Sequence, residues 1–351
     1  MRQGTDTTPE HPFPEGDAPQ RIEPDLWRIP VPLPFALRSA NIYLVGGGVD
    51  GGWTLVDSGL GLPADEAALR AGLAHAGATL DAITTLILTH AHPDHIGLSG
   101  TVHAASGAPV YMLAGEDQIM FRVWSRQGPG TFDAVGAMYT ANGLPPDQVA
   151  RAHNTLDRTR HIVCLPPPAA VRTLDDGAEL RLGQHSYRAI WTPGHADYHL
   201  CLLRDDGLFL AGDHILPSIT PNIGWYPNAR PDPLGDYYDA LARVRDLPAR
   251  LVLPGHGRPF THLATRVDEL REHHHERSGQ ILALLRAQPE GMNANSVAAA
   301  LFGVRLRSDD DRRFALVEAL AHLEHLRLTG RATREDRDGR IVYHALPATH
   351  T

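Results

Sequence analysis

The chain has 351 residues, 42% of them hydrophobic, which is enough for one large domain of about 250 residues and a smaller one. The formal net charge of −9 gives no general attraction to nucleic acids or anionic membranes, and because all 32 basic residues are arginine, a Schiff-base or phosphate-loop lysine is excluded. No apolar run approaches the roughly 20 residues that span a bilayer, and the first residues lack the apolar core of a signal peptide, so we expect a cytoplasmic protein.

The N-terminal part of the chain predicts a polar tail followed by strands. Residues 1–20 hold almost no large apolar side chain and are expected to be disordered. Beyond them the pattern predicts strands at 26–29, 41–45 and 53–56, a Gly-rich hairpin at 46–52 and a helix at 65–76. Asp57 directly follows the third of these strands.

A cluster of three imidazoles and one carboxylate follows the next strand. The apolar run 83–88 predicts a buried strand, and His90, His92, Asp94 and His95 lie within the seven residues after it. His90 and His92 are two residues apart in an extended segment and therefore point to the same side. A solvated loop that happens to be rich in histidine is the alternative, but clustered imidazoles and carboxylates are what a borderline-soft divalent metal needs. We therefore predict a metal site.

Three later loops repeat the pattern of a short apolar strand followed by a histidine or an aspartate. Before them, the sequence predicts a helix from about residue 96, a strand at 109–112 and a helix-prone segment to about 149. The later strands at 187–191, 208–211 and 251–253 lead to His195, Asp213 and His256. A glycine before each of these side chains lets the backbone turn sharply. One such turn alone is more typical of a surface loop, but we expect the four loops to meet at one edge of a sheet.

These residues resemble the metallo-beta-lactamase superfamily of hydrolases. Residues 90–95 match its HxHxDH motif, and His195, Asp213 and His256 match its later metal-ligand motifs in order and spacing. Asp57 matches the first motif, whose aspartate is structural, which implies that Asp57 supports a ligand without binding metal itself. The resemblance covers about residues 22–275. It implies an α/β (α+β) fold, an αββα sandwich of two mixed sheets with helices outside.

The number of candidate ligands indicates more than one metal ion. Five imidazoles and two carboxylates exceed what one tetrahedral ion takes, but they suit two ions that share a solvent molecule. By resemblance, the first ion takes His90, His92 and His195, the second takes Asp94, His95 and His256, and Asp213 bridges them. We expect two zinc ions, although iron or manganese would also fit these ligands. A hydroxide held between the ions is the expected nucleophile, with Asp94 as its catalytic proton acceptor.

Other residues near these loops are weaker candidates. Tyr198, Trp225, Tyr226 and Arg230 are predicted to bind substrate, and His199 to line the same pocket, with ordinary packing or surface exposure as the alternative for each. His214 is expected to point away from the site. Residues 273–275, three consecutive histidines, predict a solvated helix face, and Cys164 and Cys201 are predicted to be buried thiols.

The composition changes near residue 277, where a second domain is predicted. Helices are expected at 281–285, 297–302 and 314–328, and a hairpin at 331–345, which together suggest a winged helix. The predicted domains are therefore 21–276 and 277–351, an order that resembles the β-lactamase-like protein 2 and glyoxalase II-like branch of the superfamily. The second domain has 11 Arg against 9 Asp and Glu, a net charge of +2 that leaves −11 for the remainder. A packing or substrate-pocket role is therefore favoured over nucleic-acid binding.

The leading functional hypothesis is hydrolysis of a thioester or a related small acyl compound, as in hydroxyacylglutathione hydrolase-like enzymes. A thiolate is a good leaving group because the pKa of a thiol is about 8.5. The alternatives are a metal-dependent single-strand endoribonuclease, lactonase or β-lactamase-type ring opening, and a non-catalytic nucleic-acid-binding regulator that would not require seven metal ligands. The expected partner is a small-molecule substrate; net charge disfavours RNA, and no membrane partner is expected. The oligomeric state is left open, with a homodimer as one option.

Overall fold

The first of two large β-sheets has seven strands. The computed structural model of the protein describes residues 18–34, 37–46, 51–126 and 131–347. The strands lie side by side in chain order: β1 Gln20–Glu23, β2 Leu26–Pro32, β3 Ser39–Val45, β4 Trp53–Val56, β5 Ile83–Ile87, β6 Val110–Leu113 and β7 Val171–Leu174. Strands β1 to β4 pair antiparallel and β4 to β7 pair parallel, so β4, β5 and β6 end at the same edge.

The second sheet has five strands and faces the first. Its order is β12 Leu251–Pro254, β11 Leu208–Gly212, β10 Leu200–Arg204, β9 His185–Trp191 and β8 Glu179–Leu182, with β11 and β12 parallel and the other neighbours antiparallel. One core cluster takes side chains from both sheets, among them Leu26 and Ile87 from the first and Tyr187 and Leu253 from the second. The two sheets therefore pack face to face.

Helices cover the outer faces of both sheets. The outer face of the first sheet packs against α1 Pro63–His75, α3 Ser99–Ser106 and α4 Glu116–Trp124, and that of the second against α7 Pro233–Val244 and α8 Leu263–Ala287. Short helical turns α2 Pro93–Ile96, η1 Leu80–Ala82 and η2 Pro168–Ala170 connect these elements. The predicted αββα sandwich is confirmed.

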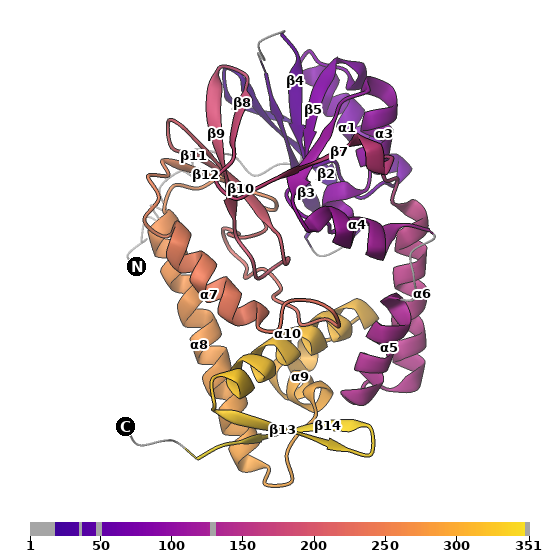
Figure 1. Ribbon diagram of the computed structural model, residues 1–351, viewed down its shortest axis with the longest axis vertical. Helices are drawn as coiled ribbons and strands as arrows, with labels where there is room; N and C mark the ends of the chain where they lie inside the picture. The colour runs from indigo at the N-terminus through magenta and orange to yellow at the C-terminus, as the bar shows by residue number, and fades with distance from the viewer. Residues whose placement is uncertain (1–17, 35–36, 47–50, 127–130, 348–351) are drawn as a thin grey trace, which may run out of the picture.

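A second core lies below the sheets in Figure 1. It contains α9 Ala294–Phe302, α10 Asp309–Leu328, the hairpin β13 Ala332–Arg337 and β14 Arg340–Ala345, and the C-terminal half of α8; η3 Gly303–Arg305 joins α9 to α10. The predicted three helices and hairpin are therefore present. Two helices from the middle of the chain, α5 Thr131–Ala141 and α6 Pro146–Ile162, pack into the same core. The predicted domain boundary at residue 277 falls inside the continuous helix α8.

The helix α10 begins at a capping box. The Ser308 hydroxyl accepts a hydrogen bond from the Asp311 backbone N–H, and the Asp311 carboxylate accepts one from the Ser308 N–H. Asp309, Asp310 and Asp311 in the first turn also favour the positive end of the helix dipole. These local signals fix where α10 starts, and its buried residues from Ala315 to Leu326 fix how it packs.

Three expectations need correction. Residues 1–17 of the predicted tail and 47–50 of the predicted hairpin lie outside the described residues, but Gln20 already pairs with Arg28 and is not disordered. His274 is fully buried between α8 and α10, because every third or fourth residue of α8 faces the core, so the histidine run is not a wholly solvated face. Cys164 is exposed, although Cys201 is buried as predicted.

Among the described helices, none combines the length and apolar character required to cross a membrane.

Candidate metal centre

The predicted ligands meet between the two sheets. His90, His92, Asp94 and His95 follow β5 of the first sheet, whereas the remaining three follow β9, β11 and β12 of the second sheet. The expectation that all four loops lie at the edge of a single sheet is therefore wrong. The site is instead formed where corresponding edges of two facing sheets come together.

Three imidazole nitrogens face one another in the first group. His90 Nε2 lies 2.9 Å from His92 Nδ1 and 3.3 Å from His195 Nε2. Ligand atoms of these three residues all lie within 4.8 Å of one another, so one metal ion could contact all of them. This group has the same members as the ligand set predicted for the first ion.

A second group contains Asp94, His95 and His256, which also have ligand atoms within 4.8 Å of one another. Asp213 lies between the two groups: its Oδ2 is 3.2 Å from His256 Nε2 and 3.6 Å from His195 Nε2, and its Oδ1 is 3.6 Å from His95 Nε2. Asp94 Oδ2 is 3.4 Å from His256 Nε2. A carboxylate in the position of Asp213 could contact metals in both groups.

The donor atoms fit a metal site because several of them have no hydrogen-bond partner. His95 Nε2, His256 Nε2 and Asp213 Oδ1 are buried and make no hydrogen bond. A buried polar atom without a hydrogen bond costs free energy, so three converging atoms of this kind favour a bound ligand. Imidazole nitrogen with carboxylate oxygen is the donor set of zinc, and iron or manganese also accept it.

The other ring nitrogen of each of four histidines is held by the protein. Nδ1 of His195 donates to the Asn222 carbonyl at 2.9 Å, and Nδ1 of His256 donates to the Ser39 carbonyl at 2.8 Å. His90 Nδ1 is 3.0 Å from the Thr89 hydroxyl, and His95 Nδ1 is 2.8 Å from Asp57 Oδ2. These contacts orient the rings so that each Nε2 points into the site.

Asp57 supports two parts of the histidine loop at once. Its Oδ1 accepts from the Thr89 N–H at 2.8 Å, while its Oδ2 holds His95. Asp57 has a backbone φ of 64°, in the left-handed region that aspartate tolerates better than most residues. Its side chain therefore lies behind the ligands, as the family motif implies.

Burial and charge divide the ligands into neutral and charged sets. Burial, reinforced by neighbouring imidazoles, lowers the pKa of His90 well below its ordinary value, and burial lowers that of His92 to about 3. Burial also opposes the charged form of His256, but Asp213 and Asp94 outweigh it and raise the pKa of His256 to about 10. Despite burial, His256 and His95 hold the pKa of Asp213 well below its ordinary value. The first group thus offers neutral imidazoles, the form that binds metal.

Sequence reasoning missed Glu116, the first residue of α4. This carboxylate is 1% exposed; its Oε1 accepts from the Ala91 N–H at 2.7 Å and its Oε2 from the Tyr198 N–H at 3.0 Å. Trp124, at the other end of α4, donates its indole N–H to the Ala91 carbonyl at 2.7 Å. The helix therefore holds both backbone groups of the residue between His90 and His92. The signal was available, because Glu116 follows β6, the parallel neighbour of β5.

Two further histidines lie behind the ligands. His199 is fully buried; its Nε2 accepts from the Asp213 N–H at 3.1 Å and its Nδ1 is 2.9 Å from the Thr192 hydroxyl, and a role in lining the pocket stays a prediction. His214 is also fully buried and belongs to none of the groups that could hold a metal. His199 therefore helps to position the backbone of Asp213.

The four predicted substrate residues lie in different surroundings. The Tyr198 ring packs against Gly115 and stacks on Trp191. Trp225 and Tyr226 pack against the second core, and the Arg230 guanidinium pairs with Asp236 at 2.5 Å and lies over the Trp191 ring. Their role in binding substrate stays a prediction.

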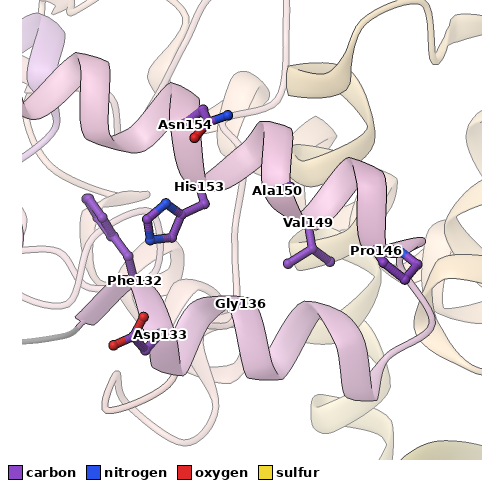
Figure 2. Close-up of a pocket in the computed structure, with 8 residues that line it drawn as sticks. All are labelled: Phe132, Asp133, Gly136, Pro146, Val149, Ala150, His153 and Asn154. Atoms are coloured by element: carbon purple, nitrogen blue, oxygen red, sulfur yellow. The ribbon is translucent and has the colours of Figure 1, made fainter.

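A hollow of about 450 Å³ lies between α5 and α6, away from the ligand residues. Figure 2 shows Phe132, Asp133 and Gly136 of α5 opposite Val149 and His153 of α6. None of the residues that line it is a predicted ligand or substrate residue. The hollow is therefore separate from the metal-ligand cluster.

Two family models match the chain. The model described as metallo-beta-lactamase superfamily matches residues 36–256, and the model described as metallo-beta-lactamase-like, C-terminal domain, matches residues 279–346. The first range contains all seven predicted ligands. The second contains α9, α10 and the C-terminal hairpin.

Relatives and solved structures extend the similarity over most of the chain. A beta-lactamase-like protein 2 homolog of Caenorhabditis elegans is 26% identical over 74% of this chain and 70% of its own length. An atrochrysone carboxyl ACP thioesterase of Aspergillus fumigatus is 26% identical over 81% of this chain and 74% of its own. The crystal structure of a metallo-beta-lactamase family protein from Thermus thermophilus superposes with a TM-score of 0.82 and 34% identity, covering 93% of this chain and all of that one.

Proposed function

The chain belongs to the metallo-beta-lactamase superfamily of metal-dependent hydrolases, and we propose that it holds two zinc ions and cleaves a thioester or a related small acyl compound. The observation that carries this proposal is the convergence of His95 Nε2, His256 Nε2 and Asp213 Oδ1, which are buried and make no hydrogen bond. His90, His92 and His195 would hold one ion, Asp94, His95 and His256 the other, and Asp213 would contact both. Bound zinc supplies Lewis acidity and lowers the pKa of a coordinated water.

The remaining residues orient the ligands and move a proton. Burial opposes ionisation of Asp94, but His95 and His256 hold its pKa below the ordinary value, so the carboxylate is ionised at neutral pH. Its side chain is 17% exposed, more than that of Asp213, so it can reach solvent. Asp94 therefore acts as proton acceptor for the attacking water. Asp57, Thr89, Asn222 and Ser39 keep the imidazoles in place.

One feature of the site and the name of one relative support an acyl substrate with a good leaving group. Nδ1 of His90, His95, His195 and His256 is committed to a protein partner, so those rings offer no spare acid for a leaving group. A thiolate needs little such help. The A. fumigatus relative is named a thioesterase, which agrees with this choice.

Exposed apolar side chains near residues that orient the ligands support the same substrate class. In the described part of the chain, Leu37, Ile219 and Phe314 are 38% to 44% exposed. Leu37 lies two residues before Ser39, Ile219 three residues before Asn222, and the Phe314 carbonyl accepts from the Asn222 side chain. Each is thus close along the chain, or bonded, to a group that orients a ligand. An acyl group could cover such apolar surface, whereas a nucleic acid would find a net charge of −11 on residues 1–276.

The experiment is thiol release from S-lactoylglutathione by zinc-loaded protein. We expect turnover that is lost in His92→Ala, because that substitution removes a ligand of the first group. If the wild-type protein binds zinc but releases no thiol, the glutathione thioester is rejected. Single-stranded RNA and lactones would then be assayed with the same pair of proteins.

A further inference from the structure

The orientation of His195 depends on a loop that has no regular structure of its own. Its Nδ1 donates to the carbonyl of Asn222, which lies in the β11–α7 loop, residues 213–232. A backbone carbonyl can orient a ring only if its own position is fixed. The contacts that fix Asn222 come from α10, an element of the C-terminal part of the chain.

The Asn222 side chain is anchored to one turn of α10. Its amide nitrogen lies 3.2 Å from Glu318 Oε2 and 3.3 Å from the Phe314 carbonyl, and it donates to both. These acceptors are four residues apart and therefore lie on the same face of the helix. Asn222 is thus joined to His195 through its carbonyl and to α10 through its side chain.

The same loop docks on α10 at two further points. The Trp225 N–H donates to the Val317 carbonyl at 3.0 Å. At Gly224, an added Cβ would lie 3.0 Å from Val317 Cγ2 and 2.8 Å from the Tyr226 ring, so the backbone packs closely against the helix. The loop is therefore held against α10 by two independent contacts besides that of Asn222.

Glu318 is itself fixed by a second helix. Its Oε1 lies 3.6 Å from Arg277 Nη1 on α8, and the two side chains are only 14% and 12% exposed. The Arg277 guanidinium also lies over the Phe302 ring of α9 at 4.6 Å. A continuous series of contacts thus runs from the C-terminal core through Glu318 and Asn222 to His195.

We propose that the C-terminal part of the chain positions the metal ligand His195, and that Glu318 and Asn222 are the positioning residues that transmit this effect. The C-terminal part is then required for tight metal binding in addition to any contact with substrate. This inference rests on the proposed ligand role of His195, but it does not depend on which substrate is cleaved. A failed thioesterase assay would therefore leave it intact.

The test is zinc affinity, measured in full-length protein by competition with a chelating dye. Loss of a group that orients a metal ligand typically costs 10–100-fold in affinity, and because Glu318 acts through Asn222 we expect about a tenfold loss in Glu318→Ala. Asn222→Ala should show a similar loss, since the backbone carbonyl stays but its anchor is removed. Glu318→Gln should bind zinc as the wild type does, because its amide oxygen still accepts from Asn222.

The matched control is Glu324→Ala. Glu324 lies on the same helix and is 2% exposed, but its carboxylate accepts from the Tyr343 hydroxyl of β14 at 2.6 Å and does not contact the loop. Its loss should lower the stability of the protein and leave zinc affinity unchanged. Wild-type zinc affinity in both Glu318→Ala and Asn222→Ala would overturn the proposal. An equal loss of affinity in Glu324→Ala would also overturn it, because the effect would then be general destabilisation.

Discussion

Replacing Glu116 should separate the stability of the protein from its affinity for metal. In Glu116→Ala the backbone N–H groups of Ala91 and Tyr198 lose their acceptor. Each buried donor left unpaired costs about 1–3 kcal/mol, so the pair costs about 2–6 kcal/mol. These two groups belong to the loops that carry His90, His92 and His195, so the geometry of the first ligand group should loosen.

The change also relieves the cost of burying a carboxylate. Burial raises the pKa of Glu116 from 4.5 to about 7, and the two N–H donors only partly offset it. At about 1.4 kcal/mol per pH unit, the 2.5-unit rise corresponds to about 3 kcal/mol when the group is ionised. At pH 8 the two effects partly cancel, and the free energy of unfolding should change by between about −3 and +1 kcal/mol. Because the folded pKa is raised, the stabilising contribution of Glu116 is complete below pH 4.5 and is lost between pH 4.5 and 7.

The assays are urea unfolding of the metal-free protein and zinc competition. We expect a 10–100-fold loss of zinc affinity in Glu116→Ala despite the small change in stability at pH 8. Glu116→Gln should also lose affinity, because its amide offers one acceptor oxygen for two donors. Trp124→Phe, which removes only the bond to the Ala91 carbonyl, should have a smaller effect. Wild-type zinc affinity in Glu116→Ala and Glu116→Gln would refute the reasoning.

Three other changes test separate parts of the structure. Asp57→Asn keeps a residue type that tolerates the left-handed backbone, but its amide cannot replace both carboxylate acceptors. Competition with a chelator should therefore show a 10–100-fold loss of zinc affinity. Unchanged zinc affinity would exclude the supporting role of Asp57. Gly255→Ala places a methyl group against Asp213 Oδ1 and 3.0 Å from His95 Cε1, so zinc binding should weaken. The control Gly279→Ala, whose added methyl group lies in open space, should bind zinc as the wild type does. Equal zinc affinities in the two variants would show that the loop adjusts. Burial lowers the pKa of His322 from 6.5 to about 3. Between pH 6.5 and pH 3 the imidazole is therefore protonated only in the unfolded state, so the stability of the folded protein falls as the pH drops below 6.5. In urea unfolding, the free energy of unfolding should fall between pH 7.5 and pH 5.0 by about 2 kcal/mol less in His322→Gln than in the wild type. Equal falls in the two proteins would contradict the lowered pKa of His322.

The sequence predicted the ligand residues better than the contacts that hold those residues in place. His90, His92, Asp94 and His95 are adjacent along the chain, so their proximity needs only one strand and one turn. Motif order then identified the later three ligand candidates. The strands themselves followed from short apolar runs bounded by glycine and polar residues, which is a local signal.

The supporting contacts are not local and could not be read in the same way. Glu116 meets Ala91 and Tyr198 only because β5 and β6 are neighbours and the second sheet packs over them. The bond between Asn222 and Glu318 joins positions 96 residues apart. The sequence predicted only a helix-prone segment to about residue 149, and it did not show that α5 and α6 pack into the C-terminal core. Packing against α10 likewise decides that the His274 side chain faces the core and not solvent.

Zinc titration of the metal-free protein followed by calorimetry tests the central claim most directly. We predict two equivalents of zinc per chain in the wild type. In His90→Ala we predict fewer than two, because His90 belongs to the first group of converging ligand atoms. Failure of the wild type to bind zinc, or the same two equivalents with the same affinity in His90→Ala, would contradict the assignment of this cluster as the metal centre.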